Sequence, residues 1–222
     1  MPLTTTSYAI LGLLDLRDWT AYDLTQQARR SLTFVWPMSE SQLYAEPKRL
    51  QQEGLLTITD TSAGPRRTRQ LLSITDSGRK ALRGWLATEP SAPRVQMEVL
   101  VRVLFATAGS KEELLSALES TRVRTQEAYD HGLSLLADYQ SGGNPFPERL
   151  HANVIWIVFV RDLLLLTLNW LSFARKQVEQ WTDSSLGGNA EQARRLVDLM
   201  VGTTSLLSTA GDAEADCPRG PT

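Results

Sequence analysis

The chain has 222 residues, which is enough for one large domain or two small ones, and its 42% hydrophobic and 22% charged residues are typical of a globular protein. Its formal net charge of −2 excludes a protein that is basic throughout. Residues 1–90 nevertheless hold 11 Lys and Arg against 9 Asp and Glu, and this local excess permits nucleic-acid binding by the first part of the chain.

Three helices are predicted at the start of the chain. Residues 4–16 have apolar side chains at helical spacing. Thr20 is expected to cap a second helix with the sequence AYDLTQQARRSL. Ser39, with Gln42 three residues later, forms the capping-box pattern that begins a third helix, and Gly54 is expected just after its end.

A β-hairpin and a fourth helix follow. LLTITDT and TRQLLSI have the β-branched, alternating character of strands, and SAGPRR between them is typical of a turn. Thr75 is expected to cap the next helix. The order of helix, helix, helix, hairpin and helix predicts a winged helix-turn-helix with a two-stranded wing.

The third predicted helix has an outer face suited to DNA. At 100° per residue, Leu43, Pro47 and Leu50 form a buried stripe. The opposite and flanking positions carry small, polar and cationic side chains, namely Ser41, Tyr44, Ala45, Lys48, Arg49 and Gln52. Such a face can contact bases and phosphates in a major groove, although a solvated surface helix has the same composition.

Pro47 interrupts this helix eight residues after its predicted cap. A proline at that depth removes one backbone hydrogen bond and its ring clashes with the preceding turn. We therefore expect a kinked helix or two short helices, with the bend between Leu43 and Lys48. In that geometry Lys48 and Arg49 both project outward.

Three arginines cluster at the predicted hairpin turn: Arg66, Arg67 and Arg69. In a winged helix, cations at this place lie beside the DNA backbone or the minor groove. A solvated loop is the alternative. Together with Ser39, Ser41, Gln42, Tyr44, Lys48 and Arg49, they are the predicted DNA-binding residues.

The rest of the chain is predicted to be helical. We expect a winged helix-turn-helix domain over residues 1–88, a linker over 89–96, a helical domain over 97–209 and a disordered tail over 210–222. Within the helical domain, helices are expected near 95–107, 111–140, 147–182 and 190–208. The second of these begins with a capping box of Ser110 and Glu113.

Residues 150–181 are apolar almost all round, and one small chain has few elements to cover such a helix. A second subunit would cover it, so this part of the chain is predicted to be a C-terminal antiparallel helical dimerisation domain. With the winged helix-turn-helix before it, the whole chain is predicted to be mainly α. The expected interface residues are Leu100, Leu104, Trp156, Phe159, Leu163, Leu166 and Trp170. A membrane span is not predicted, because Arg161 and Asp162 divide residues 152–174 into uncharged runs of 9 and 12 residues.

The sequence resembles the PadR-like family of bacterial transcriptional regulators. WPMSESQLYAEPKRLQQEGLL, followed by a basic hairpin and SITDSGRKAL, carries the resemblance, and SYAILGLLDLRDWTAYDL is similar to the first two helices of the family. The helical remainder is similar to the longer class of the family. The sequence departs from the family pattern at Ala45 and Pro47, where Pro usually follows the Leu-Tyr pair directly and an aliphatic residue stands two positions later.

The resemblance implies a homodimeric regulator, expected to be a repressor, that binds a palindromic operator of double-stranded DNA through residues 39–53. Carried over by position, Ser39, Tyr44 and Arg49 contact the DNA. The resemblance also implies a slot near the dimer interface for a small aromatic effector. Trp156 and Trp170 are the candidates, because Trp156, Trp170 and Trp181 share one helix face; core or interface packing is the alternative.

No catalytic or metal-binding motif is present. His131 and His151 are isolated, and the lone Cys217 completes no zinc-ligand set. Because these motifs are missing, we expect a protein that is not an enzyme and has no cofactor and no metal. A single cysteine is typical of a reducing compartment, so we expect the protein in the cytoplasm and not in a membrane. The competing hypotheses are a winged-helix module for protein interaction, without specific DNA binding, and a membrane-associated regulator that depends on residues 152–174.

Overall fold

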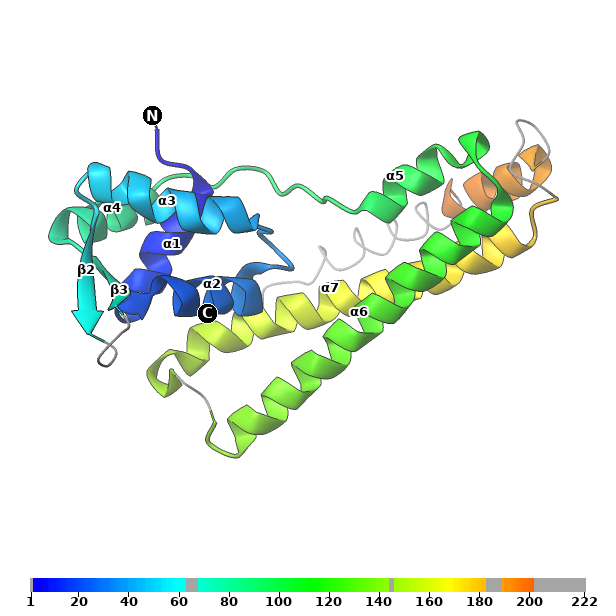
Figure 1. The fold of residues 1–222 in the computed structure, drawn as a ribbon. Coiled ribbons are helices and arrows are strands. Elements are labelled where there is room, and N and C mark those ends of the chain that lie inside the picture. The colour runs from blue at the N-terminus through cyan, green and yellow to red at the C-terminus, as the bar shows by residue number, and fades with distance from the viewer. Residues whose placement is uncertain (1, 63–67, 144–145, 183–188, 202–222) are drawn as a thin grey trace, which may run out of the picture. The chain divides into compact units, whose positions relative to one another are not determined.

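The computed structural model describes residues 2–62, 68–143, 146–182 and 189–201. The chain divides into two compact units, Met1–Arg94 and Val95–Thr222. Figure 1 shows both units: the first combines helices with a small sheet, and the described part of the second is helical.

The first unit has the element order of a winged helix-turn-helix, as predicted. Its elements are α1 (Thr5–Leu16), β1 (Trp19–Thr20), α2 (Ala21–Leu32), α3 (Glu40–Gln52), β2 (Leu56–Ser62), β3 (Thr68–Ile74) and α4 (Asp76–Leu86). The predicted N-caps are confirmed, because the side chains of Thr20, Ser39 and Thr75 each accept a backbone hydrogen bond from the first turn that follows. Gly54 follows the end of α3 with φ of 72°, as expected of a residue at that position.

The sheet has three strands in the order β1-β3-β2, and both pairings are antiparallel. The hairpin runs in register from Leu56 opposite Ile74 to Ser62 opposite Thr68. The two-residue strand β1 adds a third strand through Trp19 opposite Leu72, which the sequence analysis did not foresee. Trp19 is buried, and its indole N–H donates to the carbonyl oxygen of Leu13 at 2.7 Å.

α1 lies at the centre of the first unit and packs against α2, α3, α4 and β3. Its buried side chains include Ile10, Leu11 and Leu14. The predicted stripe of α3 is also confirmed, since Leu43, Pro47 and Leu50 are all buried. Burial of this stripe against α1 leaves the opposite face of α3 exposed.

α3 is one helix from Glu40 to Gln52 with Pro47 inside it, so the alternative of two short helices is wrong and the kink stays a prediction. Three features offset the loss of the backbone hydrogen bond that Pro47 cannot donate. The Ser39 capping box begins the helix, the turn at Gly54 ends it, and the proline ring itself is buried in the core. Tertiary packing therefore overrides the local preference.

The second unit contains α5 (Glu98–Leu104), η1 (Ala106–Ala108), α6 (Lys111–Gln140), η2 (Pro147–Arg149) and α7 (Leu150–Glu179). Residues 190–201 form a further helical segment. The capping box of Ser110 and Glu113 is confirmed at the start of α6. Residues 202–209 of the last predicted helix and the predicted tail over 210–222 lie outside the described residues.

α6 and α7 form an antiparallel hairpin (Figure 1). The Lys111 ammonium at the start of α6 donates to the carbonyl oxygens of Glu179 and Trp181 at the end of α7, at 2.8 and 2.7 Å. About two helical turns further along α6, Glu119 pairs with Arg175 of α7 at 2.7 Å. These contacts fix the N-terminal end of α6 beside the C-terminal end of α7.

The core of the second unit lies at that same end of the hairpin. It consists of Val99, Leu114, Leu118, Leu171, Ala174 and Val178, with Trp170 and Trp181 packed against it. The N-terminal half of α7 contributes no side chain to this cluster, and Ile155 there is 75% exposed. α7 is therefore buried in the core at its C-terminal end, whereas its N-terminal half exposes apolar side chains.

Candidate nucleic-acid interface

The outer face of α3 presents polar groups to solvent. Ser41, Ala45, Lys48 and Gln52 are exposed, as the helical spacing predicts. Tyr44 flanks this face and is 43% exposed. A small residue at the centre allows close approach, and hydroxyl, ammonium and amide groups stand around it.

The predicted DNA-binding residues Ser39 and Gln42 form the cap of α3. The Ser39 hydroxyl accepts from the Gln42 backbone N–H at 3.2 Å, and the Gln42 side-chain oxygen accepts from the Ser39 backbone N–H at 2.9 Å. The hydroxyls of Ser39 and Ser41 are 2.9 Å apart. Both residues remain exposed, at the positive end of the helix dipole.

Arg49 lies differently from Lys48, and the expectation that both project outward is wrong for Arg49. Its side chain is 24% exposed and forms an ion pair with Glu53 at 2.8 Å. Its Nε donates to a carboxylate oxygen of Glu46 at 3.1 Å, and its Nη2 donates to the Ser7 hydroxyl of α1 at 2.7 Å. Carboxylates three residues before and four residues after an arginine lie on the same helix face, so they hold the guanidinium there.

This pairing shifts the pKa of both groups. Hydrogen bonding from Arg49 lowers the pKa of Glu46 below its ordinary value, although partial burial opposes the shift. The hydrogen bond to Glu46 raises the pKa of Arg49 in turn. Both groups are therefore charged at neutral pH, and their charges compensate each other within the protein.

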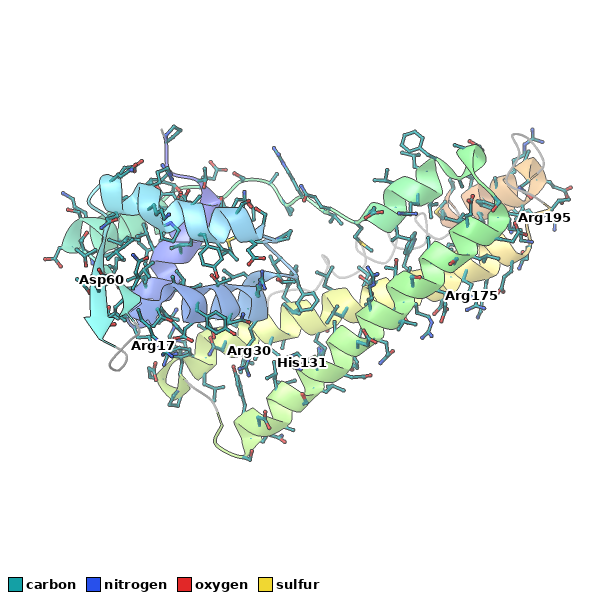
Figure 2. The ribbon with its side chains drawn as sticks, viewed as in Figure 1. Arg17, Arg30, Asp60, His131, Arg175 and Arg195 are labelled. Atoms are coloured by element: carbon teal, nitrogen blue, oxygen red, sulfur yellow. The ribbon has the colours of Figure 1, made fainter. Side chains whose placement is uncertain are left out.

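The predicted wing arginines fall only partly within the described residues. Arg69 lies on β3 with an exposed side chain, and its carbonyl oxygen accepts from the Thr61 hydroxyl at 3.0 Å. Arg66 and Arg67 lie outside the described residues. Asp60 of β2, labelled in Figure 2, is the exposed carboxylate of the same hairpin.

Two further arginines that the sequence analysis did not single out lie together on the first unit. Arg17 and Arg30, both labelled in Figure 2, line a hollow of about 330 Å³ with Trp19, Asp23, Gln26 and Gln27. The Arg17 guanidinium lies 3.8 Å from the centroid of the Trp19 ring, in cation–π contact. These residues stand in separate elements, so no local motif marks them.

The predicted interface residues of the second unit are exposed to different degrees. Leu100, Leu104, Phe159 and Leu166 are exposed, with Leu104 at 74%. Trp156 and Leu163 are intermediate. Trp170 packs against the core of its own unit, and so does Trp181. Core packing, the alternative explanation of the tryptophan stripe, thus holds for Trp170 and Trp181.

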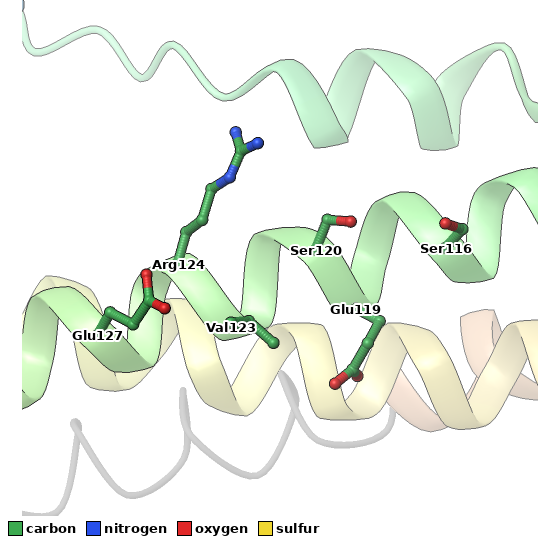
Figure 3. Close-up of a pocket in the computed structure, with 6 residues that line it drawn as sticks. All are labelled: Ser116, Glu119, Ser120, Val123, Arg124 and Glu127. Atoms are coloured by element: carbon green, nitrogen blue, oxygen red, sulfur yellow. The ribbon is translucent and has the colours of Figure 1, made fainter.

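A hollow of about 500 Å³ follows one face of α6 (Figure 3). The lining side chains are those of Ser116, Glu119, Ser120, Val123, Arg124 and Glu127. None is aromatic, and neither Trp156 nor Trp170 contributes to it. This hollow is therefore not the predicted slot for an aromatic effector, and that slot stays a prediction.

Among the residues that the structure describes, no three His, Cys, Asp or Glu side chains are grouped so that they could hold a metal ion. One helical stretch, Pro147–Glu179, is long and apolar enough to cross a membrane by length and composition, and 11% of its most apolar window is buried. A helix in the core of a soluble protein can have the same length and composition.

Residues 10–84 match the Transcriptional regulator PadR-like family. The Negative transcriptional regulator PadR of Bacillus subtilis (strain 168) is 34% identical over 107 residues, which are 48% of this chain. The match spans 59% of the length of that relative. The family match, residues 10–84, lies within the first unit.

Solved structures of Bacillus subtilis PadR share the fold over most of this chain. The complex with operator DNA has a TM-score of 0.64 at 23% identity and covers 79% of this chain and 99% of that one. The complex with p-coumaric acid has a TM-score of 0.57 at 22% identity and covers 80% of this chain and 100% of that one. The predicted resemblance is thus confirmed: residues 10–84 match the model of the PadR-like family, and the chain shares the fold of these PadR structures.

Proposed function

We propose that this chain is a sequence-specific DNA-binding transcriptional regulator that represses transcription as a homodimer on a palindromic operator. The outer face of α3 carries the proposal. Ser41, Lys48 and Gln52 are exposed there on the second helix of the helix-turn-helix, and Ala45 leaves room between them. Ammonium, hydroxyl and amide groups are those that contact base edges and phosphates in a major groove.

The comparisons support the same proposal. The Bacillus subtilis relative is named a negative transcriptional regulator, and one structure with this fold contains operator DNA. A regulator of this kind acts in the cytoplasm, where we place the chain, and needs no catalytic group. The proposed DNA contacts are Ser39 at the cap of α3, Ser41, Gln42, Tyr44 and Lys48 on that helix, and the arginines predicted for the wing, Arg66, Arg67 and Arg69.

In the proposed dimer, a second copy of the chain covers the exposed apolar side chains of the second unit. Phe159 and Leu166 are seven residues apart on α7, so they lie on one face, and both are exposed. The exposed apolar side chains of α5, among them Leu100 and Leu104, extend the surface that a partner can bury. A two-fold dimer matches a palindromic operator, because each first unit then binds one half-site.

We also propose that a small aromatic effector releases the dimer from DNA. One structure with this fold, that of Bacillus subtilis PadR, contains p-coumaric acid, a flat aromatic molecule. Trp156 suits such a ligand better than Trp170, because Trp170 already packs against its own core. Saturable quenching of tryptophan fluorescence by phenolic acids, lost in Trp156→Leu, is expected; unchanged quenching in that variant contradicts the site.

DNA binding is tested by selection of random duplexes with the purified chain, followed by gel shifts of the selected duplex. We expect two half-sites about one helical turn apart and an affinity that falls steeply with salt. A scrambled duplex of the same composition is the control. If no selected duplex is retained at low salt, the proposal fails and a protein-interaction module becomes the better account.

A further inference from the structure

We infer that Arg49 orients the DNA-binding helix rather than contacting DNA itself, and that Glu46 and Ser7 are the positioning residues that hold it. We call these three residues the Ser7–Glu46–Arg49 network. The inference rests on the proposed function of α3 and narrows its DNA-contacting residues to those on the exposed face. It reverses the role that sequence position alone assigns to Arg49.

The network joins α1 to the middle of α3 through one oxygen atom. The Ser7 hydroxyl donates to a carboxylate oxygen of Glu46 at 2.5 Å and accepts from Nη2 of Arg49 at 2.7 Å. The same oxygen accepts from the Thr4 backbone N–H at 2.8 Å, as part of the cap of α1. Ser7 is fully buried, so this junction lies in the interior of the first unit.

All three nitrogens of the Arg49 guanidinium have partners within the protein. Nε donates to Glu46, Nη1 pairs with Glu53, and Nη2 donates to both Ser7 and Glu46. An arginine that contacts guanine uses two of its N–H groups in one plane. Arg49 would have to give up hydrogen bonds to charged partners to do so, and these are among the stronger bonds in a protein.

The position of the network explains why α3 needs it. Glu46 and Arg49 lie on either side of Pro47, where the helix lacks one backbone hydrogen bond. Contacts to α1 on both sides of the proline fix the rotation of α3 about its own axis. That rotation decides where Lys48 and Gln52, both exposed, point relative to bound DNA.

Glu46→Gln separates the two roles by the sign of its effect. If Arg49 contacts DNA, loss of the neighbouring negative charge leaves the affinity unchanged or raises it. If the network orients α3, Glu46→Gln lowers affinity for the selected duplex by about tenfold or more while binding to the scrambled duplex persists. Arg49→Lys keeps the charge but loses the bidentate geometry, so it should weaken specific binding similarly.

The salt dependence of binding gives an independent readout. A lysine or arginine that contacts a phosphate contributes about 0.9 to the slope of log K against log salt concentration. Arg49→Leu should therefore keep the slope of the wild-type chain, whereas Lys48→Met should lower it. A lower slope in Arg49→Leu overturns the inference, and so does wild-type specific affinity in Glu46→Gln.

Ser7→Ala is the second variant, because it removes one hydroxyl and leaves both charges in place. A lower affinity of Ser7→Ala for the selected duplex, with an unchanged salt slope, supports the inference. Wild-type affinity for that duplex overturns it. Circular dichroism at the assay temperature verifies that each variant is folded. If the wild-type chain itself retains no duplex, the proposed function fails as well, and this outcome differs from failure of the network in a chain that binds DNA.

Discussion

Gly78 at the start of α4 lies directly against Leu55. A Cβ atom built on Gly78 would be 2.1 Å from the carbonyl oxygen of Leu55 and 2.8 Å from a side-chain carbon of Ile74. The same carbonyl accepts the backbone N–H of Thr75 at 3.1 Å, and the Thr75 hydroxyl caps α4 by accepting from the Gly78 N–H at 3.1 Å. Glycine therefore lets α4 begin against the turn between α3 and β2.

Gly78→Ala is expected to destabilise the first unit by about 1–3 kcal/mol, because backbone on both sides must move to admit a methyl group. Gly84→Ala is the matched control in the same helix. A Cβ there meets nothing within 4 Å, so alanine should stabilise the helix by about 0.5–1 kcal/mol. Thermal unfolding followed by circular dichroism measures both, and equal shifts in the two variants contradict the close contact.

Lys48→Met is expected to weaken binding to specific and scrambled duplexes alike. The exposed ammonium of Lys48 suits a phosphate contact, and its loss should reduce the salt slope by about 0.9. Lys80→Met removes another exposed cation, one on α4, and serves as the control. Affinities measured by fluorescence anisotropy at several salt concentrations give the slope, and equal slopes for the two variants contradict the assignment.

The free energy of unfolding should fall as the pH drops below the ordinary value of 4.5 for Glu46. Arg49 lowers the pKa of Glu46 in the folded state, so the carboxylate contributes stability above the unfolded pKa. That contribution is lost as the pH falls through the lower, folded pKa. Denaturant unfolding of the wild-type chain and Glu46→Gln should therefore differ most near neutral pH and converge in acid.

Glu89→Gln removes an exposed carboxylate after α4 and is the control for the change in net charge. Its free energy of unfolding should stay close to that of the wild-type chain across the range. A constant difference between the wild-type chain and Glu46→Gln at all pH values would show that Glu46 stabilises the fold through its shape rather than its charge.

Local patterns predicted the elements of the first unit well. Caps at Thr20, Ser39 and Thr75 depend on side chains within three residues of the helix start, so they can be recognised in a short window of sequence. The buried stripe of Leu43, Pro47 and Leu50 follows from helical geometry alone.

Features that depend on distant contacts escaped prediction. The strand β1 has two residues and exists only because Trp19 pairs with Leu72, far along the chain. The environment of Arg49 has a local and a distant part. Glu46 and Glu53 stand at the spacing of helix ion pairs and could have been noticed, whereas Ser7 approaches from α1 only once the helices pack.

Leu166→Glu is expected to convert the proposed dimer into a monomer. Leu166 is 65% exposed in the single chain, so a glutamate is tolerated there by the folded subunit but would bury a charge in an interface. Lys176→Glu, at an exposed position near the end of the same helix, is the control and should remain dimeric. Sedimentation equilibrium measures the dissociation constant, and gel shifts should show a parallel loss of operator affinity because one subunit contacts only one half-site. An unchanged dimer in Leu166→Glu would place the interface on another face of the second unit.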